Sequence, residues 1–193
     1  MKTKATIILC ELASFTLLVW HSSVYAATLF LAPQSIEAGT GEKIVVDLKV
    51  DSEGVSFNAA QATIRFPKDL VEVASIDKTG SAFSFWLEEP TFSNSEGIIS
   101  FTGGTPYGVS GGSIQIFKIV FTPKGSGADN LSLSDAAVTA SDGSGTNILS
   151  KTIDAAVTIR STKVTPAPRI LPPVEITRKP TPSSGWKRCR KRK

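Results

Sequence analysis

The side chains that most often perform catalysis are nearly absent from this chain. The single histidine is His21, and the two cysteines are Cys10 and Cys189. His21 and Cys10 fall in an N-terminal segment that we expect to be removed, which leaves one thiol and no imidazole. A Ser-His-Asp triad or a Cys-His pair needs an imidazole as its base, and a zinc site of His and Cys fails for the same reason. The residues therefore predict a protein that is not an enzyme, and one thiol allows no internal disulfide.

Two groups of oxygen ligands could still suggest chemistry. Glu88 and Glu89 resemble a glycosidase pair, but hydrolysis needs carboxyls that face each other about 5–10 Å apart. Neighbours on an extended chain point to opposite sides. The run from Asp142 to Asn147 resembles a calcium loop, yet it lacks acidic third and fifth ligands and has Ile153 at the twelfth position. We expect no catalytic residue and no metal site, and we interpret the run as a turn.

A cluster of aromatic residues allows a sugar-binding alternative. Phe83, Phe85, Trp86, Phe92 and Tyr107 lie within one stretch of the sequence, and aromatic faces pack against the apolar faces of pyranose rings as they do on other apolar groups. In this alternative Trp86 and Tyr107 bind the sugar. The other interpretation is that these side chains pack into the core or under loops.

The elements that would position such residues read as strands. From Ala60 to Phe66 every second residue is apolar, so Gln61, Thr63 and Arg65 face outward from a half-buried strand. Ser100 and Thr102 face outward in another strand, and the glycine-rich stretch 103–112 reads as a loop. No segment keeps a helical period, and turn residues recur about every 8–12 residues, which predicts an all-β sandwich or barrel. We expect about nine strands, at 28–33, 43–51, 60–66, 71–76, 98–102, 113–122, 131–133, 136–140 and 155–160.

The first 26 residues have the pattern of a signal peptide. Lys2 and Lys4 precede a mostly apolar run from Ile7 to Trp20, and small residues at Val24 and Ala26 suit cleavage after Ala26. The alternative is a membrane anchor that is never cleaved. Cleavage would leave a secreted or cell-surface protein with a domain at 27–160 and a tail at 161–193.

Charge divides the domain from the tail. Residues 27–160 carry a net charge of −6, whereas residues 161–193 carry +9 and six prolines. We therefore expect a disordered, Pro-rich basic tail, and we expect no nucleic-acid partner because the basic charge lies outside the domain. The tail has three interpretations: a solvated end, a tether to anionic wall polymer or lipid, or the flank of a membrane span that is missing from this chain.

The sequence resembles a cohesin module over residues 28–160. The resemblance rests on Gly54-Val55, Phe66-Pro67-Lys68-Asp69-Leu70-Val71-Glu72-Val73, Gly97-Ile98-Ile99-Ser100-Phe101, Ile116-Phe117-Lys118-Ile119-Val120-Phe121, Ser141-Asp142-Gly143 and Ala156-Val157-Thr158-Ile159. These are mostly core positions of a β-sandwich. They therefore identify the fold more firmly than the partner.

The resemblance implies a nine-stranded jelly-roll sandwich that binds a dockerin, the calcium-loaded helical module of secreted polysaccharide-degrading enzymes. Any calcium would then belong to the partner, and this chain would need no cofactor. Ala59 and Gln61 stand where well-studied members have Asn and Asp. The alternatives are a carbohydrate-binding module, with polysaccharide as partner, and a structural surface protein that self-associates along an edge strand. The resemblance places the first docking strand at Ala59 to Arg65, with Gln61, Thr63 and Arg65 outward. We expect Ser100 and Thr102 to lie on the same sheet, so the predicted docking residues are Ala59, Gln61, Thr63, Arg65, Ser100 and Thr102.

Overall fold

The computed structural model describes residues 27–161, so the predicted signal peptide and nearly all of the predicted tail lie outside the described residues. Within 27–161 the chain forms strands and turns, and no helix there is long and apolar enough to cross a membrane. The strands are β1 (Ala27–Ala32), β2 (Ser35–Gly39), β3 (Ile44–Asp51), β4 (Phe57–Arg65), β5 (Val71–Asp77), β6 (Phe85–Ser93), β7 (Ile98–Val109), β8 (Ile114–Pro123), β9 (Gly127–Ala140), β10 (Leu149–Ile153) and β11 (Ala155–Arg160).

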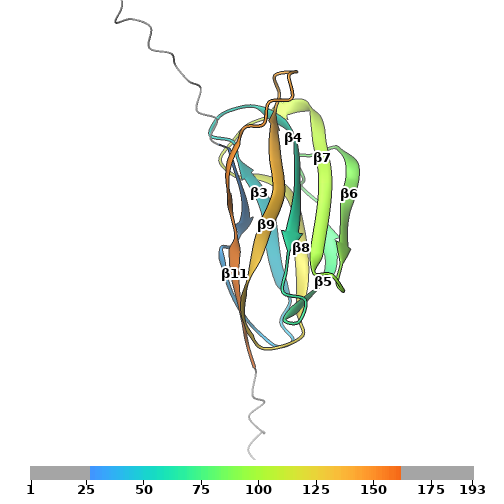
Figure 1. Ribbon diagram of the computed structural model, residues 1–193, viewed down its shortest axis with the longest axis vertical. Coiled ribbons are helices and arrows are strands. Elements are labelled where there is room, and N and C mark those ends of the chain that lie inside the picture. Colours follow the sequence, from blue (N-terminus) through green and yellow to red (C-terminus); the bar gives the residue numbers. More distant parts are fainter. Residues whose placement is uncertain (1–26, 162–193) are drawn as a thin grey trace, which may run out of the picture. The chain divides into compact units, whose positions relative to one another are not determined.

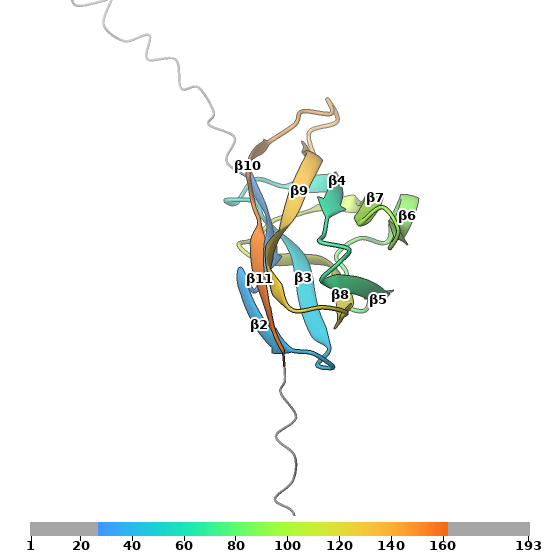
Figure 2. The same ribbon diagram turned by 60° about the horizontal axis from the view of Figure 1, so that its bottom comes forward.

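The strands form two sheets that pack face to face. The five-stranded sheet has the order β10-β1-β3-β8-β5, and the six-stranded sheet has the order β2-β11-β9-β4-β7-β6. Figure 1 shows β9, β4, β7 and β6 following one another across the second sheet, and Figure 2 shows β3, β8 and β5 of the other sheet below them. The predicted all-β sandwich is confirmed.

Residues 27–161 form eleven strands rather than the nine predicted, because three edge strands (β2, β6 and β10) were not expected and two expected strands are one. β2 and β10 are five-residue edge strands, and β6 is an edge strand whose pairing with β7 is irregular at two points. In the other direction, residues 131–133 and 136–140 belong to one strand, β9. This strand continues through a bulge in which Asp135 has a φ of 50°.

Glycines are part of β7, where a loop was predicted. Gly103 and Gly104 lie within this strand. A Cβ at Gly103 would come within 2.5 Å of the Trp86 ring, and one at Gly104 would meet the Asn58 carbonyl. These glycines therefore allow a close approach of neighbouring groups rather than a flexible loop.

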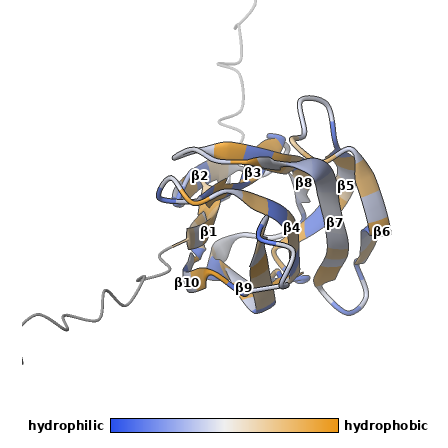
Figure 3. Ribbon diagram, turned by 90° about the horizontal axis from the view of Figure 1, so that it is seen from above, coloured by the Kyte–Doolittle hydropathy of each residue, from blue (hydrophilic) through white to orange (hydrophobic). Residues whose placement is uncertain are grey.

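The core lies between the sheets and is rich in phenylalanine. Hydrophobic and hydrophilic residues alternate along the strands, as Figure 3 shows, so each strand turns its apolar side inward. Phe101 of β7 and Phe117 of β8 meet edge to face, with ring centroids 5.0 Å apart. The largest fully buried side chains include Phe57, Phe101, Phe117, Phe121, Leu29, Leu31 and Leu48. This packing holds β4 and β7 against the five-stranded sheet and fixes which residues they turn outward.

Candidate partner-binding face

The predicted docking strand β4 lies in the interior of its sheet. It pairs with β9 on one side and β7 on the other, and β7 pairs with β6. Their outward positions lie opposite one another in four rows of four, and we call this surface the β4 face. The rows are Thr139, Ala59, Gly104, Phe85; Ala137, Gln61, Thr102, Glu88; Ser134, Thr63, Ser100, Thr91; and Ser132, Arg65, Ile98, Ser93.

The structure brings the six predicted docking residues onto this one surface. Gln61 lies opposite Thr102, and Thr63 lies opposite Ser100. Ala59 and Arg65 extend the same strand at either end of these pairs. Gln61 and Arg65 are exposed, and the others are partly buried by their neighbours.

The β4 face is dominated by small hydroxyl side chains. Eight of its sixteen positions are serine or threonine, and each hydroxyl can both donate and accept a hydrogen bond. Small side chains also protrude little from the sheet, so the backbone of another molecule can approach it closely. The face can therefore form many hydrogen bonds without rearrangement.

Two carboxylates that sequence reasoning did not assign to this face border its centre. A depression of about 110 Å³ is lined by Gln61, Thr63, Ser100 and Thr102 together with Glu88 and Asp135. Glu88 Oε1 accepts a hydrogen bond of 2.8 Å from Ser100 Oγ. Neither Glu88 nor Asp135 forms an ion pair with any described residue. The depression therefore concentrates negative charge that the domain itself does not neutralise.

The adjacent glutamates have different surroundings. Glu89 forms an ion pair with Lys78, whereas Glu88 bonds to Ser100 on the β4 face. The run that resembles a calcium loop is closed by its own hydrogen bonds, because Asp142 accepts from Ser144 N and Thr146 Oγ1. Among residues 27–161, no group of three or more His, Cys, Asp or Glu side chains could hold a metal ion.

The two residues of the sugar-binding alternative differ in their packing. Trp86 is partly buried against the core and contacts Phe83 and Phe101 edge to face. Tyr107 is 83% exposed. Lys78 Nζ also lies 5.5 Å from the centroid of the Trp86 ring. The Trp86 ring is therefore engaged by protein groups, whereas Tyr107 is open to solvent.

Comparison with known families gives one match. The model described as the cohesin domain matches residues 30–159. Comparison with curated protein sequences gives no match.

Several solved structures share the fold. The non-cellulosomal cohesin of the archaeon Archaeoglobus fulgidus is 18% identical, with a TM-score of 0.58 over 72% of this chain and 94% of that one. The cohesin module of a Clostridium perfringens family 33 glycoside hydrolase is 15% identical, with a TM-score of 0.54, and covers 70% of this chain and 96% of that one. A chain of a type I cohesin–dockerin complex from Clostridium thermocellum is 13% identical, with a TM-score of 0.51. The match covers 70% of this chain and 93% of that one.

Proposed function

The chain belongs to the cohesin family, and we propose that it is a non-catalytic module that binds a dockerin-type protein through the β4 face. The observation that carries this proposal is the continuous set of outward residues on β9, β4, β7 and β6. Relatives of similar fold are found in cohesin–dockerin complexes. We further propose that the protein is exported and that its basic tail holds it near an anionic cell surface.

The chemistry of the β4 face defines what the partner must present. The hydroxyls and Gln61 offer donors and acceptors to polar groups, and Glu88 with Asp135 favours a lysine or arginine at the centre. Phe85, which is 49% exposed at one corner of the face, offers an apolar contact. A partner helix with a central basic residue and an apolar residue toward Phe85 would satisfy all three.

A charge placed on this face tests the proposal. The full chain is used to capture secreted proteins of the same organism, with calcium and with chelator, before and after Thr63→Arg. We expect capture of a calcium-dependent partner to be lost, because an arginine protrudes from the middle of the face, while the free energy of unfolding changes by no more than about 0.5 kcal/mol.

Thr122→Arg is the matched control. Thr122 is a partly buried threonine on β8, opposite Glu72 and on the outward side of the other sheet. Capture should survive this change. If Thr63→Arg keeps the partner, or if Thr122→Arg loses it, the β4 face is not the binding surface. Capture of no protein in either calcium condition, with retention on polysaccharide, would instead favour the sugar-binding alternative.

A further inference from the structure

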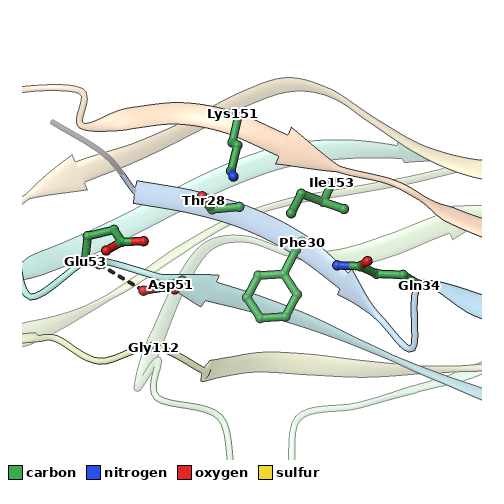
Figure 4. Close-up of a pocket in the computed structure, with 8 residues that line it drawn as sticks. All are labelled: Thr28, Phe30, Gln34, Asp51, Glu53, Gly112, Lys151 and Ile153. Atoms are coloured by element: carbon green, nitrogen blue, oxygen red, sulfur yellow. Dashed lines mark hydrogen bonds between the residues drawn. The ribbon is translucent and has the colours of Figure 1, made fainter. Parts of the chain in front are cut away.

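A second depression lies on the outward side of the five-stranded sheet, away from the β4 face. It measures about 220 Å³ and is bordered by β1, β10 and the end of β3. Figure 4 shows Lys151 on one side, Asp51 and Glu53 on the other, and the Phe30 ring between Asp51 and Gln34. Charged groups of opposite sign therefore face the same small space.

The charges on the two walls are held apart by the sheet. Lys151 of β10 lies opposite Thr28 of β1, and Thr28 lies opposite Asp51 of β3. Two strand spacings separate the walls by about 10 Å at the backbone. Lys151 forms no ion pair with a described residue, and neither Asp51 nor Glu53 does. A cation and two carboxylates therefore stay unneutralised across the depression.

The turn at the end of β3 fixes the acidic wall. Asp51 Oδ1 accepts a hydrogen bond of 3.0 Å from the Glu53 amide. Glu53 has a φ of 47°, and its exposed side chain has no hydrogen-bonding partner among the described residues. Asp51 thus supports the turn, whereas the Glu53 carboxylate is free to take a ligand.

One part of the floor of the depression is apolar, next to the Thr28 side chain that lies between the charged walls. Phe30 of β1 lies opposite Ile153 of β10, and both side chains are partly buried. Gln34 follows at the far end and adds an amide. The volume is below the roughly 300–1,000 Å³ of pockets for drug-sized ligands, which limits the ligand to a small molecule.

We propose that this depression binds a small zwitterion of the α-amino-acid class with an apolar side chain. The ligand carboxylate pairs with Lys151, the ligand ammonium pairs with Glu53, and the apolar side chain packs on Phe30 and Ile153. A ligand with one charge would leave the opposite wall unpaired in the same space. This site shares no residue with the β4 face, so it is independent of the proposed function.

Amide shifts in the 15N-labelled full chain test the proposal. The probe is an equimolar mixture of L-alanine, L-valine, L-leucine, L-isoleucine, L-methionine and L-phenylalanine, each at about 10 mM, since an open site of this size suggests millimolar affinity. Shifts are expected at Thr28, Glu53, Gly112 and Lys151. N-acetyl-L-leucine and L-leucine methyl ester, which each lack one charge, should bind at least about 10-fold more weakly than L-leucine. No shift with the mixture, or equal binding of all three leucine compounds, would overturn the proposal.

Matched charge removals locate the site. Lys151→Gln and Glu53→Gln should each raise the half-saturating leucine concentration about 10-fold. Lys43→Gln and Glu96→Gln remove exposed charges elsewhere on the domain and should leave it unchanged. If the control variants weaken binding as much as the test variants, leucine is not bound in this depression and the assignment fails.

Discussion

The outward sides of the two sheets differ in how their polar groups are satisfied. On the five-stranded sheet, away from the depression at Lys151, charges lie beside opposite charges. Lys118 of β8 lies between Asp47 and Asp77, and Lys49 Nζ is 3.2 Å from Asp47 Oδ2. On the β4 face, half the positions are hydroxyls, and Glu88 and Asp135 have no ion-pair partner among the described residues.

This difference in pairing between the two sheets indicates which side gains most from binding a partner. A face whose charges are paired gains little from a second molecule, because that molecule must replace interactions already present. A face of small hydroxyls bordered by carboxylates without ion-pair partners can gain new hydrogen bonds, because each hydroxyl can both donate and accept. The same rule singles out the small depression at Lys151, which is where the pairing of the five-stranded sheet is incomplete.

The largest expected effect is a loss of stability when a core residue beneath the β4 face is removed. Phe101 lies between Ser100 and Thr102 on β7, and it is 1% exposed. Phe101→Ala should lower the free energy of unfolding by about 3–5 kcal/mol, because it removes a buried ring and leaves a cavity. Urea denaturation measures this loss. Tyr107→Ala on the same strand should change it by no more than about 0.5 kcal/mol, and a comparable loss there would contradict the assignment of inward and outward residues.

A smaller effect is expected at the unpaired carboxylates. Glu88→Gln and Asp135→Asn should each lower the affinity for the captured partner about 10-fold, since each removes one charge-assisted hydrogen bond. Asn is tolerated at the left-handed φ of residue 135. Calorimetric titration measures the affinity, and the losses should shrink as salt is added.

The control for this pair lies one residue away. Glu89→Gln removes a carboxylate that is already paired with Lys78, and it should leave the affinity within about twofold. Equal losses from Glu88→Gln and Glu89→Gln would mean that general acidity matters, rather than the depression between Glu88 and Asp135.

Much of the fold and part of the β4 face could be predicted from the sequence. The alternation from Ala60 to Phe66 sets the outward residues of β4, and Ser100 and Thr102 follow from the same rule on β7. Glu88 could not be placed, because irregular pairing between Trp86 and Glu88 and between Glu88 and Thr91 decides which way it points.

The position of Asp135 and the depression at Lys151 depend on pairing between strands that are far apart in the sequence. Asp135 joins the face only because β9 carries a bulge opposite the stretch from Gln61 to Thr63. The depression at Lys151 exists only because β10 pairs in parallel with β1, more than a hundred residues earlier in the chain. A local pattern contains neither the bulge nor the partner strand, so neither could be derived from it.

The smallest expected effect is a change in the pKa of Asp142, in a turn that links the two sheets but lies outside both binding surfaces. Asp142 lies in the turn between β9 and β10, and its pKa is lowered from 3.8, first by the hydrogen bond from the Thr146 hydroxyl and then by the Ser144 amide. A carboxyl whose pKa is lower in the folded state stabilises the fold above its unfolded pKa, and this contribution is lost as the pH falls through the folded pKa. Acid should therefore loosen this turn below about pH 4.

Removing the hydroxyl isolates its contribution. In Thr146→Val the pKa of Asp142 should rise toward its ordinary value, as carbon-detected NMR titration of the carboxyl would measure. Asp77 is the internal control, because the Thr79 side chain is the main cause of its lowered pKa, and its titration should not move. An unchanged pKa of Asp142 would mean that the Ser144 amide alone is sufficient. Partner affinity should be unchanged in this variant, because none of the sixteen positions of the β4 face belongs to the turn.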